Sequence, residues 1–147
     1  MIVASRYHDF SAGHRVAGHE NKCAHLHGHN YRIHFDVHAP DLDGVGRVMD
    51  FSIIKSLLCQ WLEDNWDHRM LLWEDDPKLD MLLGCAGPHG SFLDDIVTVP
   101  FNPTAENMAR YLVEVVGPRQ LQGTGCTLIR CRVEETRKCG AEYVSGH

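Results

Sequence analysis

The sequence predicts an α+β fold, in which an antiparallel sheet is covered on one face by helices. In residues 2–14, 25–38 and 124–136, apolar and polar residues alternate with the period of a half-buried strand. In residues 51–65 and 103–116, apolar residues instead recur with the period of an amphipathic helix. The order is strand, strand, helix, short strand, helix, strand, and the 147 residues suit one domain, so we expect a single domain over residues 1–147.

The first strand, residues 2–14, ends its apolar row in a histidine. Phe10, Ala12 and His14 share one face, because residues two apart on a strand point the same way. Arg6 and His8 fall on that face too, which suggests a bulge or an exposed end. His14 is therefore a candidate metal ligand, although a partly buried histidine bonded to the backbone fits the same periodicity.

The second strand, residues 25–38, begins with two histidines on its apolar face. His27 and His29 start a row that continues through Tyr31, Ile33, Phe35 and Val37. A catalytic zinc typically takes three protein ligands and keeps a fourth position open, so His14 is needed as the third. Cys23 lies four residues before His27 and is a candidate base or nucleophile beside the metal. A histidine-rich surface strand that binds metal by accident has the same local spacing.

The first helix, residues 51–65, is expected to be capped by Asp50. Its apolar stripe consists of Phe51, Ile54, Leu57, Leu58, Trp61 and Leu62. Asp67 and His68 follow, and such a pair can orient and charge-tune an imidazole. The alternative is a helix C-terminus with a favourable cation near the dipole. Residues 73–95 are acidic and then glycine-rich, with one helical turn expected at 79–83, and we interpret them as a surface insertion.

The C-terminal half contains a short strand at 96–99, the second helix and the last long strand. Thr104 or Asn102 is expected to cap the second helix, which Gly117-Pro118 should end. In the strand 124–136, Glu135 shares the apolar face, where a carboxylate is costly unless it has partners. Residues 140–144 are a candidate edge strand.

Composition excludes several classes of protein. The net charge is −6 with neutral histidines, so no broad surface for nucleic acid or anionic membranes is indicated. No apolar run approaches the roughly 18 residues of a membrane span, and the N-terminus lacks the pattern of a signal peptide, so we expect a cytoplasmic protein. The six cysteines include no C-x-x-C pair, and disulfides are not expected. Eleven histidines is a high count, for which metal chemistry is one explanation.

Together these residues resemble the 6-pyruvoyltetrahydropterin synthase and 6-carboxytetrahydropterin synthase family. The resemblance covers most of the chain, and its motifs occur in the order of the family. They are Phe10-x-Ala12-x-His14, Cys23-x-x-x-His27-Gly28-His29, Met49-Asp50-Phe51, Asp67-His68, Pro103-Thr104-x-Glu106-Asn107 and Glu135-Thr136. The gap of three residues after Cys23 is most similar to the bacterial carboxy-forming enzymes of 7-deazaguanine biosynthesis.

The resemblance implies a tunnelling fold (T-fold), with a four-stranded antiparallel sheet and two helices on one face. Such subunits assemble into a β-barrel, here a homo-oligomer and by resemblance a hexamer, with active sites at subunit interfaces. The implied site residues fall into three sets: Zn²⁺ on His14, His27 and His29; a catalytic set of Cys23, Asp67 and His68; and substrate binding by Glu135, Thr104 and Glu106, with Glu135 on the amino-pyrimidine edge of a pterin.

The implied reaction is the zinc-dependent conversion of 7,8-dihydroneopterin triphosphate to 6-carboxy-5,6,7,8-tetrahydropterin, acetaldehyde and triphosphate. The alternatives are the pyruvoyl-forming reaction at the same site and a non-catalytic pterin- or metal-binding protein. Because the substrate is strongly anionic and the chain is acidic, a local basic pocket is required. Lys22, Arg15 and Arg69 are the candidates nearby in sequence.

Overall fold

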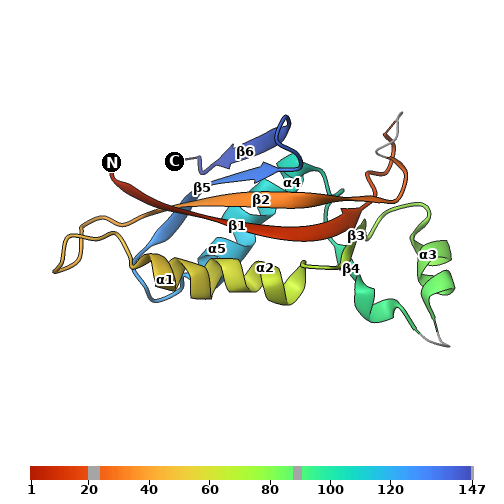
Figure 1. The fold of residues 1–147 in the computed structure, drawn as a ribbon, viewed down its shortest axis with the longest axis horizontal. Coiled ribbons are helices and arrows are strands. Elements are labelled where there is room, and N and C mark those ends of the chain that lie inside the picture. The colour runs from red at the N-terminus through yellow and green to blue at the C-terminus, as the bar shows by residue number, and fades with distance from the viewer. Residues whose placement is uncertain (20–23, 88–90, 147) are drawn as a thin grey trace.

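Six strands form one curved mixed sheet in the order β4-β3-β1-β2-β5-β6 (Figure 1). The computed structural model describes residues 1–19, 24–87 and 91–146. The strands are β1 (Val3–His14), β2 (His27–His38), β3 (Met70–Trp73), β4 (Ile96–Val99), β5 (Thr127–Glu134) and β6 (Gly140–Val144). The expected four-stranded antiparallel sheet was therefore wrong, because β3 and β4 extend the sheet beyond β1, and β3 runs parallel to both of its neighbours.

The longest strands, β1 and β2, pair with each other along the sheet. The register of this pair is unbroken from Val3 opposite His38 to His14 opposite His27. The bulge suggested by Arg6 and His8 is absent from this pair. Both side chains reach the first helix instead, since Arg6 Nη1 donates to the Phe51 carbonyl at 3.1 Å and His8 contacts Glu63.

Two long helices cover one face of the sheet. The first runs through α1 (Phe51–Ile54), a π-helical segment (Lys55–Cys59) and α2 (Gln60–Asn65). The Asp50 carboxylate caps it by accepting from the Ser52 backbone N–H, as predicted. Figure 1 shows this helix running along β1, while the second helix crosses behind β2 and β5.

The second helix is capped by Thr104, whose hydroxyl accepts from the Asn107 backbone N–H at 3.1 Å. It runs through α4 (Ala105–Tyr111), a π-helical segment (Leu112–Val116) and α5 (Gly117–Gln120). The expected stop at Gly117-Pro118 was wrong. Gly117 serves packing here, because a Cβ on it would lie 2.9 Å from Leu128 Cβ.

The core lies between the helices and the sheet face that they cover. It includes Phe10, Tyr31, Ile33 and Phe35 from the strands and Ile54, Leu58, Leu62, Trp66, Met108 and Leu112 from the helices. The opposite face carries several ion pairs. Examples are Arg32 with Asp9 at 2.8 Å and Arg130 with Asp36 at 2.7 Å. No helix among the described residues has the length and apolar character needed to cross a bilayer.

Residues 73–95 hold more structure than the expected surface insertion with one helical turn. They contain α3 (Leu79–Ala86) and a 3-10 turn (Leu93–Asp95) after the end of β3. The segment is anchored by a buried ion pair between Arg15, directly after β1, and Asp76.

The last long strand is shorter than predicted and irregular. The register shifts opposite Asp36 and Val37, so Leu128, Cys131 and Val133 face the core and Ile129 does not. β5 ends at Glu134, and Glu135 lies in the following turn, where its N–H bonds the Cys139 carbonyl at 3.1 Å.

Candidate metal centre and its surroundings

Three histidines converge where β1 ends and β2 begins. The register sets His14 opposite His27 and Ala12 opposite His29, so all three imidazoles project from the helix-covered face. Their ring centroids are 4.6, 5.0 and 4.9 Å apart. One ring nitrogen from each lies within 4.8 Å of the other two, which makes the trio a candidate metal site.

Hydrogen bonds to backbone carbonyls orient two of these rings. His14 Nδ1 is 2.6 Å from the Pro103 carbonyl, and His27 Nδ1 is 2.8 Å from the His25 carbonyl. Donation from Nδ1 assigns both Nε2 atoms as unprotonated, and they face each other at 3.0 Å. Two imidazoles on one tetrahedral zinc, each bonded at about 2.0–2.1 Å, place their nitrogens about 3.3 Å apart. The donor set therefore fits a zinc ion.

Burial keeps two of the imidazoles, those of His14 and His29, in the form that binds metal. Burial lowers the pKa of His14 to about 4, although the bond to the Pro103 carbonyl opposes this. Burial also lowers the pKa of His29, against the opposing field of Glu135. The His29 Nε2 atom is buried and has no hydrogen-bond partner among the described residues. A cation would supply the partner that this nitrogen lacks.

Glu135 lies against the histidines although it is outside the strand. Its Oε1 is 4.0 Å from His14 Nε2 and its Oε2 is 3.7 Å from His29 Nε2. A cavity of about 310 Å³ is lined by Glu135, His14, Thr104 and Glu106. The structure thus brings the three expected substrate-binding residues together beside His14, a candidate metal ligand.

Two further side chains at the centre were not assigned a role from sequence. Cys139 lines the same cavity, brought there by the turn that joins β5 to β6. The Tyr31 hydroxyl is buried beside His14 and His29, with no hydrogen-bond partner among the described residues. Tyr31 follows His29 by two residues on one strand face, a signal present in the sequence, whereas nothing local marks Cys139.

Asp67 and His68 bind each other and dock on the edge of β1. Asp67 Oδ1 accepts from the Ser11 backbone N–H at 3.1 Å, and the His68 N–H bonds the Ser11 carbonyl at 2.7 Å. His68 Nδ1 is 2.9 Å from Asp67 Oδ2. Burial favours the neutral acid, but the bonds from His68 and Ser11 outweigh it and lower the pKa of Asp67. His68 has a positive φ of 58° and a side chain that is 80% exposed.

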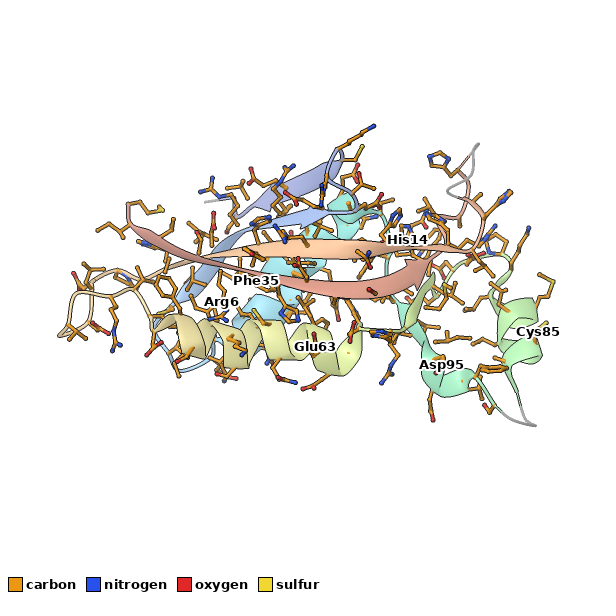
Figure 2. The ribbon with its side chains drawn as sticks, viewed as in Figure 1. Arg6, His14, Phe35, Glu63, Cys85 and Asp95 are labelled. Atoms are coloured by element: carbon orange, nitrogen blue, oxygen red, sulfur yellow. The ribbon has the colours of Figure 1, made fainter. Side chains whose placement is uncertain are left out.

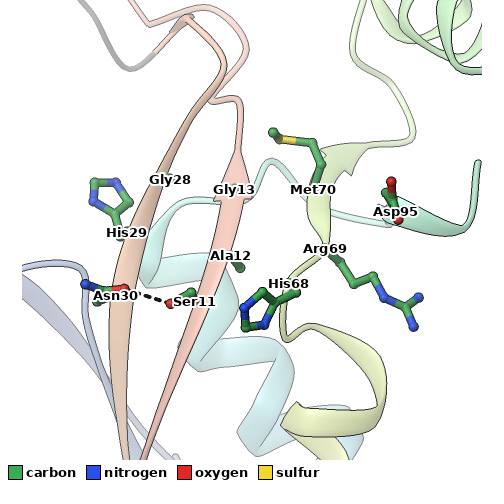
Figure 3. A pocket seen from close by; sticks show the side chains of 10 residues that line it. All are labelled: Ser11, Ala12, Gly13, Gly28, His29, Asn30, His68, Arg69, Met70 and Asp95. Carbon is green, nitrogen blue, oxygen red and sulfur yellow. Dashed lines mark hydrogen bonds between the residues drawn. The ribbon is translucent and has the colours of Figure 1, made fainter. Parts of the chain in front are cut away.

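This pair and the histidine cluster lie on opposite faces of the sheet. His68 and Arg69 line a cavity of about 620 Å³ together with Ser11 and Asn30. The Ser11 and Asn30 side chains, which bond each other at 2.7 Å, alternate with the metal-site histidines and so project from the uncovered face. Figure 3 shows the His29 ring on one side of β2 and the His68 ring beyond β1. A larger cavity of about 1150 Å³ includes members of both sets in its lining, among them His29, Glu135 and His68.

The remaining candidates from the sequence are Cys23 and three basic residues. Cys23 and Lys22 lie outside the residues that the structure describes. Arg15 is engaged by the buried Asp76 carboxylate. Arg69 reaches the cavity on the uncovered face.

Comparisons with known proteins show the family to which the sequence is related. The model of the family described as 6-pyruvoyl tetrahydropterin synthase matches residues 4–145. A 6-carboxy-5,6,7,8-tetrahydropterin synthase of Rickettsia felis is 34% identical over 143 residues, which cover 97% of this chain and 99% of the relative.

Solved structures share the fold at lower identity. An uncharacterized protein of Wolinella succinogenes superposes with a TM-score of 0.86 at 24% identity, covering 99% of this chain and 98% of the other. The 6-pyruvoyl tetrahydropterin synthase of Caenorhabditis elegans gives a TM-score of 0.67 at 22% identity, covering 99% and 96%.

Proposed function

The chain belongs to the 6-pyruvoyl tetrahydropterin synthase family and has its tunnelling fold, and on this premise we propose that it is a zinc-dependent 6-carboxy-5,6,7,8-tetrahydropterin synthase. It would act as a lyase that converts 7,8-dihydroneopterin triphosphate to 6-carboxy-5,6,7,8-tetrahydropterin, acetaldehyde and triphosphate. The reaction would serve 7-deazaguanine biosynthesis, which leads to queuosine, in the cytoplasm. The observation that supports this most directly is the trio of Nε2 atoms converging beside the Glu135 carboxylate.

His14, His27 and His29 would hold the zinc, which when bound supplies a Lewis acid that polarises the hydroxyls of the substrate side chain. Glu135 would accept hydrogen bonds from the N–H edge of the pterin, a charge-assisted pair. Thr104 and Glu106 line the same cavity and would contact the pterin from the start of α4.

Proton transfer is assigned to Cys23, Asp67 and His68. Because His68 Nδ1 faces Asp67, its Nε2 remains free to give or take a proton. Cys23, as thiolate, would take a proton from the substrate side chain.

We further propose that a second copy of the chain completes the site. The three histidines project from the helix-covered face, whereas the His68 side chain lines the cavity that the Ser11 and Asn30 side chains share on the uncovered face. In a homo-oligomer, by resemblance a hexamer, the pair of one subunit would serve the zinc of another. The partners are then a small-molecule substrate and copies of this chain, without nucleic acid or membrane.

Arg69 is the preferred anchor for the triphosphate. Arg15 already neutralises Asp76 in the interior. The structure records no ion-pair partner for the Arg69 guanidinium among the described residues, and Arg69 lines a cavity with the neutral polar groups of Ser11 and Asn30 and with the acidic Asp95. It also follows directly after the Asp67–His68 pair, so the subunit that supplies the pair supplies the charge as well.

Mass spectrometry of the products formed from 7,8-dihydroneopterin triphosphate tests the proposal. Equal release of acetaldehyde and 6-carboxytetrahydropterin is expected. Triphosphate release with a pyruvoyl product would assign the pyruvoyl-forming reaction, and bound but unchanged substrate would indicate a binding protein.

Metal analysis of His27→Ala and His29→Ala is expected to show loss of zinc, whereas Cys23→Ala should keep zinc and lose most turnover.

A further inference from the structure

The carbonyl that orients His14 belongs to Pro103, two residues before α4 begins. His14 Nδ1 is 2.6 Å from this carbonyl oxygen, and 89 residues of sequence separate the two. Figure 2 shows His14 at the end of β1. The contact therefore depends on how the segment before α4 is held against the end of that strand.

The Asn102 side chain ties this segment to the chain just after His14. Its Oδ1 accepts from the Ala17 N–H at 3.0 Å, and its Nδ2 donates to the Ala17 carbonyl at 2.8 Å. Ala17 offers one backbone donor and one acceptor, so this two-point pairing leaves the amide a single orientation. Because Ala17 follows His14 by three residues and Asn102 precedes Pro103, the bonds join both sides of the His14–Pro103 contact.

The backbone of Asn102 is fixed as well, from the side of the helix. Its carbonyl accepts from the Thr104 N–H at 2.7 Å, which closes a three-residue turn around Pro103. Asn107, in the first turn of α4, donates from Nδ2 to the same carbonyl at 3.0 Å. Since the ring of proline fixes φ, this turn leaves little freedom for the Pro103 carbonyl to rotate away from His14.

The direction of this carbonyl matters because neutral His14 carries one proton and has two places for it. On Nδ1 the proton bonds the Pro103 carbonyl, and on Nε2 it would bond His27 Nε2, which is 3.0 Å away. A proton on Nε2 would join the two imidazoles to each other and remove the lone pair that a metal requires. The Pro103 carbonyl therefore favours the tautomer that can bind a metal.

We propose that Asn102 and Asn107 are positioning residues that hold the Pro103 carbonyl against His14 Nδ1 and so keep His14 in the tautomer that leaves Nε2 to the metal. Partners of this kind tune metal affinity, because they set the orientation and the tautomer of a ligating imidazole. Where it concerns zinc, this inference rests on the proposed function.

The tautomer of His14 can be read by long-range ¹H–¹⁵N NMR of the metal-free full chain at pH 7. In the wild type we expect the proton on Nδ1, and both Asn102→Ala and Asn107→Ala should populate the Nε2–H form. Alanine favours a helix more than asparagine does, so Asn107→Ala removes the donor without weakening α4. Asn65→Ala is the matched control, because Asn65 Nδ2 donates to the Trp61 carbonyl at 2.9 Å on another helix. It should keep the wild-type tautomer.

Zinc affinity provides the second measurement, by competition with a chromophoric chelator and zinc alone. We expect Asn102→Ala and Asn107→Ala each to weaken zinc binding roughly tenfold, the low end of the effect of losing an outer partner of a ligating histidine. Asn65→Ala should bind zinc as the wild type does.

A His14 proton that stays on Nδ1 in both Asn102→Ala and Asn107→Ala would overturn the inference, and so would a shifted tautomer with unchanged zinc affinity. The tautomer is read without metal or substrate, which separates this inference from the proposed function. A wild-type chain that binds zinc but leaves 7,8-dihydroneopterin triphosphate unchanged, while the variants show the expected shifts, would support the positioning role and contradict the proposed synthase.

Discussion

Glu135 faces the imidazoles of His14 and His29 across 4.0 and 3.7 Å, while its neighbour Glu134 bonds Arg132 on the uncovered face. Glu135→Gln keeps the size and removes the charge. We expect pterin binding to weaken by roughly 2 to 4 kcal/mol, the cost of losing a buried charged hydrogen-bond partner. Calorimetric titration with the substrate measures this loss of affinity.

Glu134→Gln is the control for this change, because it alters the adjacent residue by the same atoms. It should leave pterin affinity and thermal stability nearly unchanged. A larger loss of affinity in Glu134→Gln than in Glu135→Gln would show that the pterin anchor is misassigned.

The buried His14 imidazole makes the metal-free protein sensitive to acid. Its pKa of about 4 in the folded chain lies below the ordinary value of 6.5, so between these values the unfolded chain binds the additional proton. The contribution of His14 to the free energy of unfolding is therefore fully present above about pH 6.5 and is lost as the pH falls toward 4. Urea unfolding at pH 7 and pH 5 should differ by about 2 kcal/mol from this residue. In His14→Asn, the free energy of unfolding should differ less between pH 7 and pH 5, by the contribution of this imidazole. An unchanged pH dependence in the variant would contradict the assignment to His14.

At the scale of elements, the second helix packs on β5 at a glycine. An alanine at Gly117 would gain about 1 kcal/mol of helix propensity, but its Cβ would lie 2.9 Å from Leu128 Cβ, and neither atom can move without the backbone. Overpacking of this kind costs about 1–3 kcal/mol, so Gly117→Ala should be destabilising on balance in thermal unfolding.

Gly84 in α3 allows the same substitution in open space, since nothing lies within 4 Å of its added Cβ. Gly84→Ala should stabilise the protein by about 0.5–1 kcal/mol. If both alanine variants gained stability, the contact between the second helix and β5 would be looser than the structure indicates.

At the scale of the whole molecule, the Arg15–Asp76 pair connects the residue after the candidate metal ligand His14 to the segment 73–95. The Asp76 side chain is fully buried, and one of its oxygens has no partner among the described residues. Arg15→Met would leave that charge uncompensated, at a cost of about 3–5 kcal/mol in urea unfolding.

The double variant Arg15→Met/Asp76→Asn removes both charges and should recover part of that loss. Asp76→Asn retains an oxygen for the Lys78 N–H, which Asp76 Oδ1 accepts at 2.9 Å. A double variant no more stable than Arg15→Met would show that packing of Arg15, not its charge, supports the segment.

The sequence by itself determined which residues share a face and where the helices begin. Alternation over two residues is a property of the extended backbone, so it placed His27 and His29 with Tyr31, and the cap at Asp50 is equally local. Local periodicity was therefore enough to single out the three histidines as candidate ligands.

The tertiary structure decided everything that depends on pairing between distant segments. Only the β1–β2 register sets His14 opposite His27, only the addition of β3 and β4 makes the sheet mixed, and only the docking of α2 on β1 joins His8 to Glu63. It also set the Asp67–His68 pair against Ser11 at the edge of β1 and the three candidate metal-binding histidines on the helix-covered face. Periodicity assigns a side chain to a face, but the element that comes to lie against that face is chosen by the packing of the whole chain.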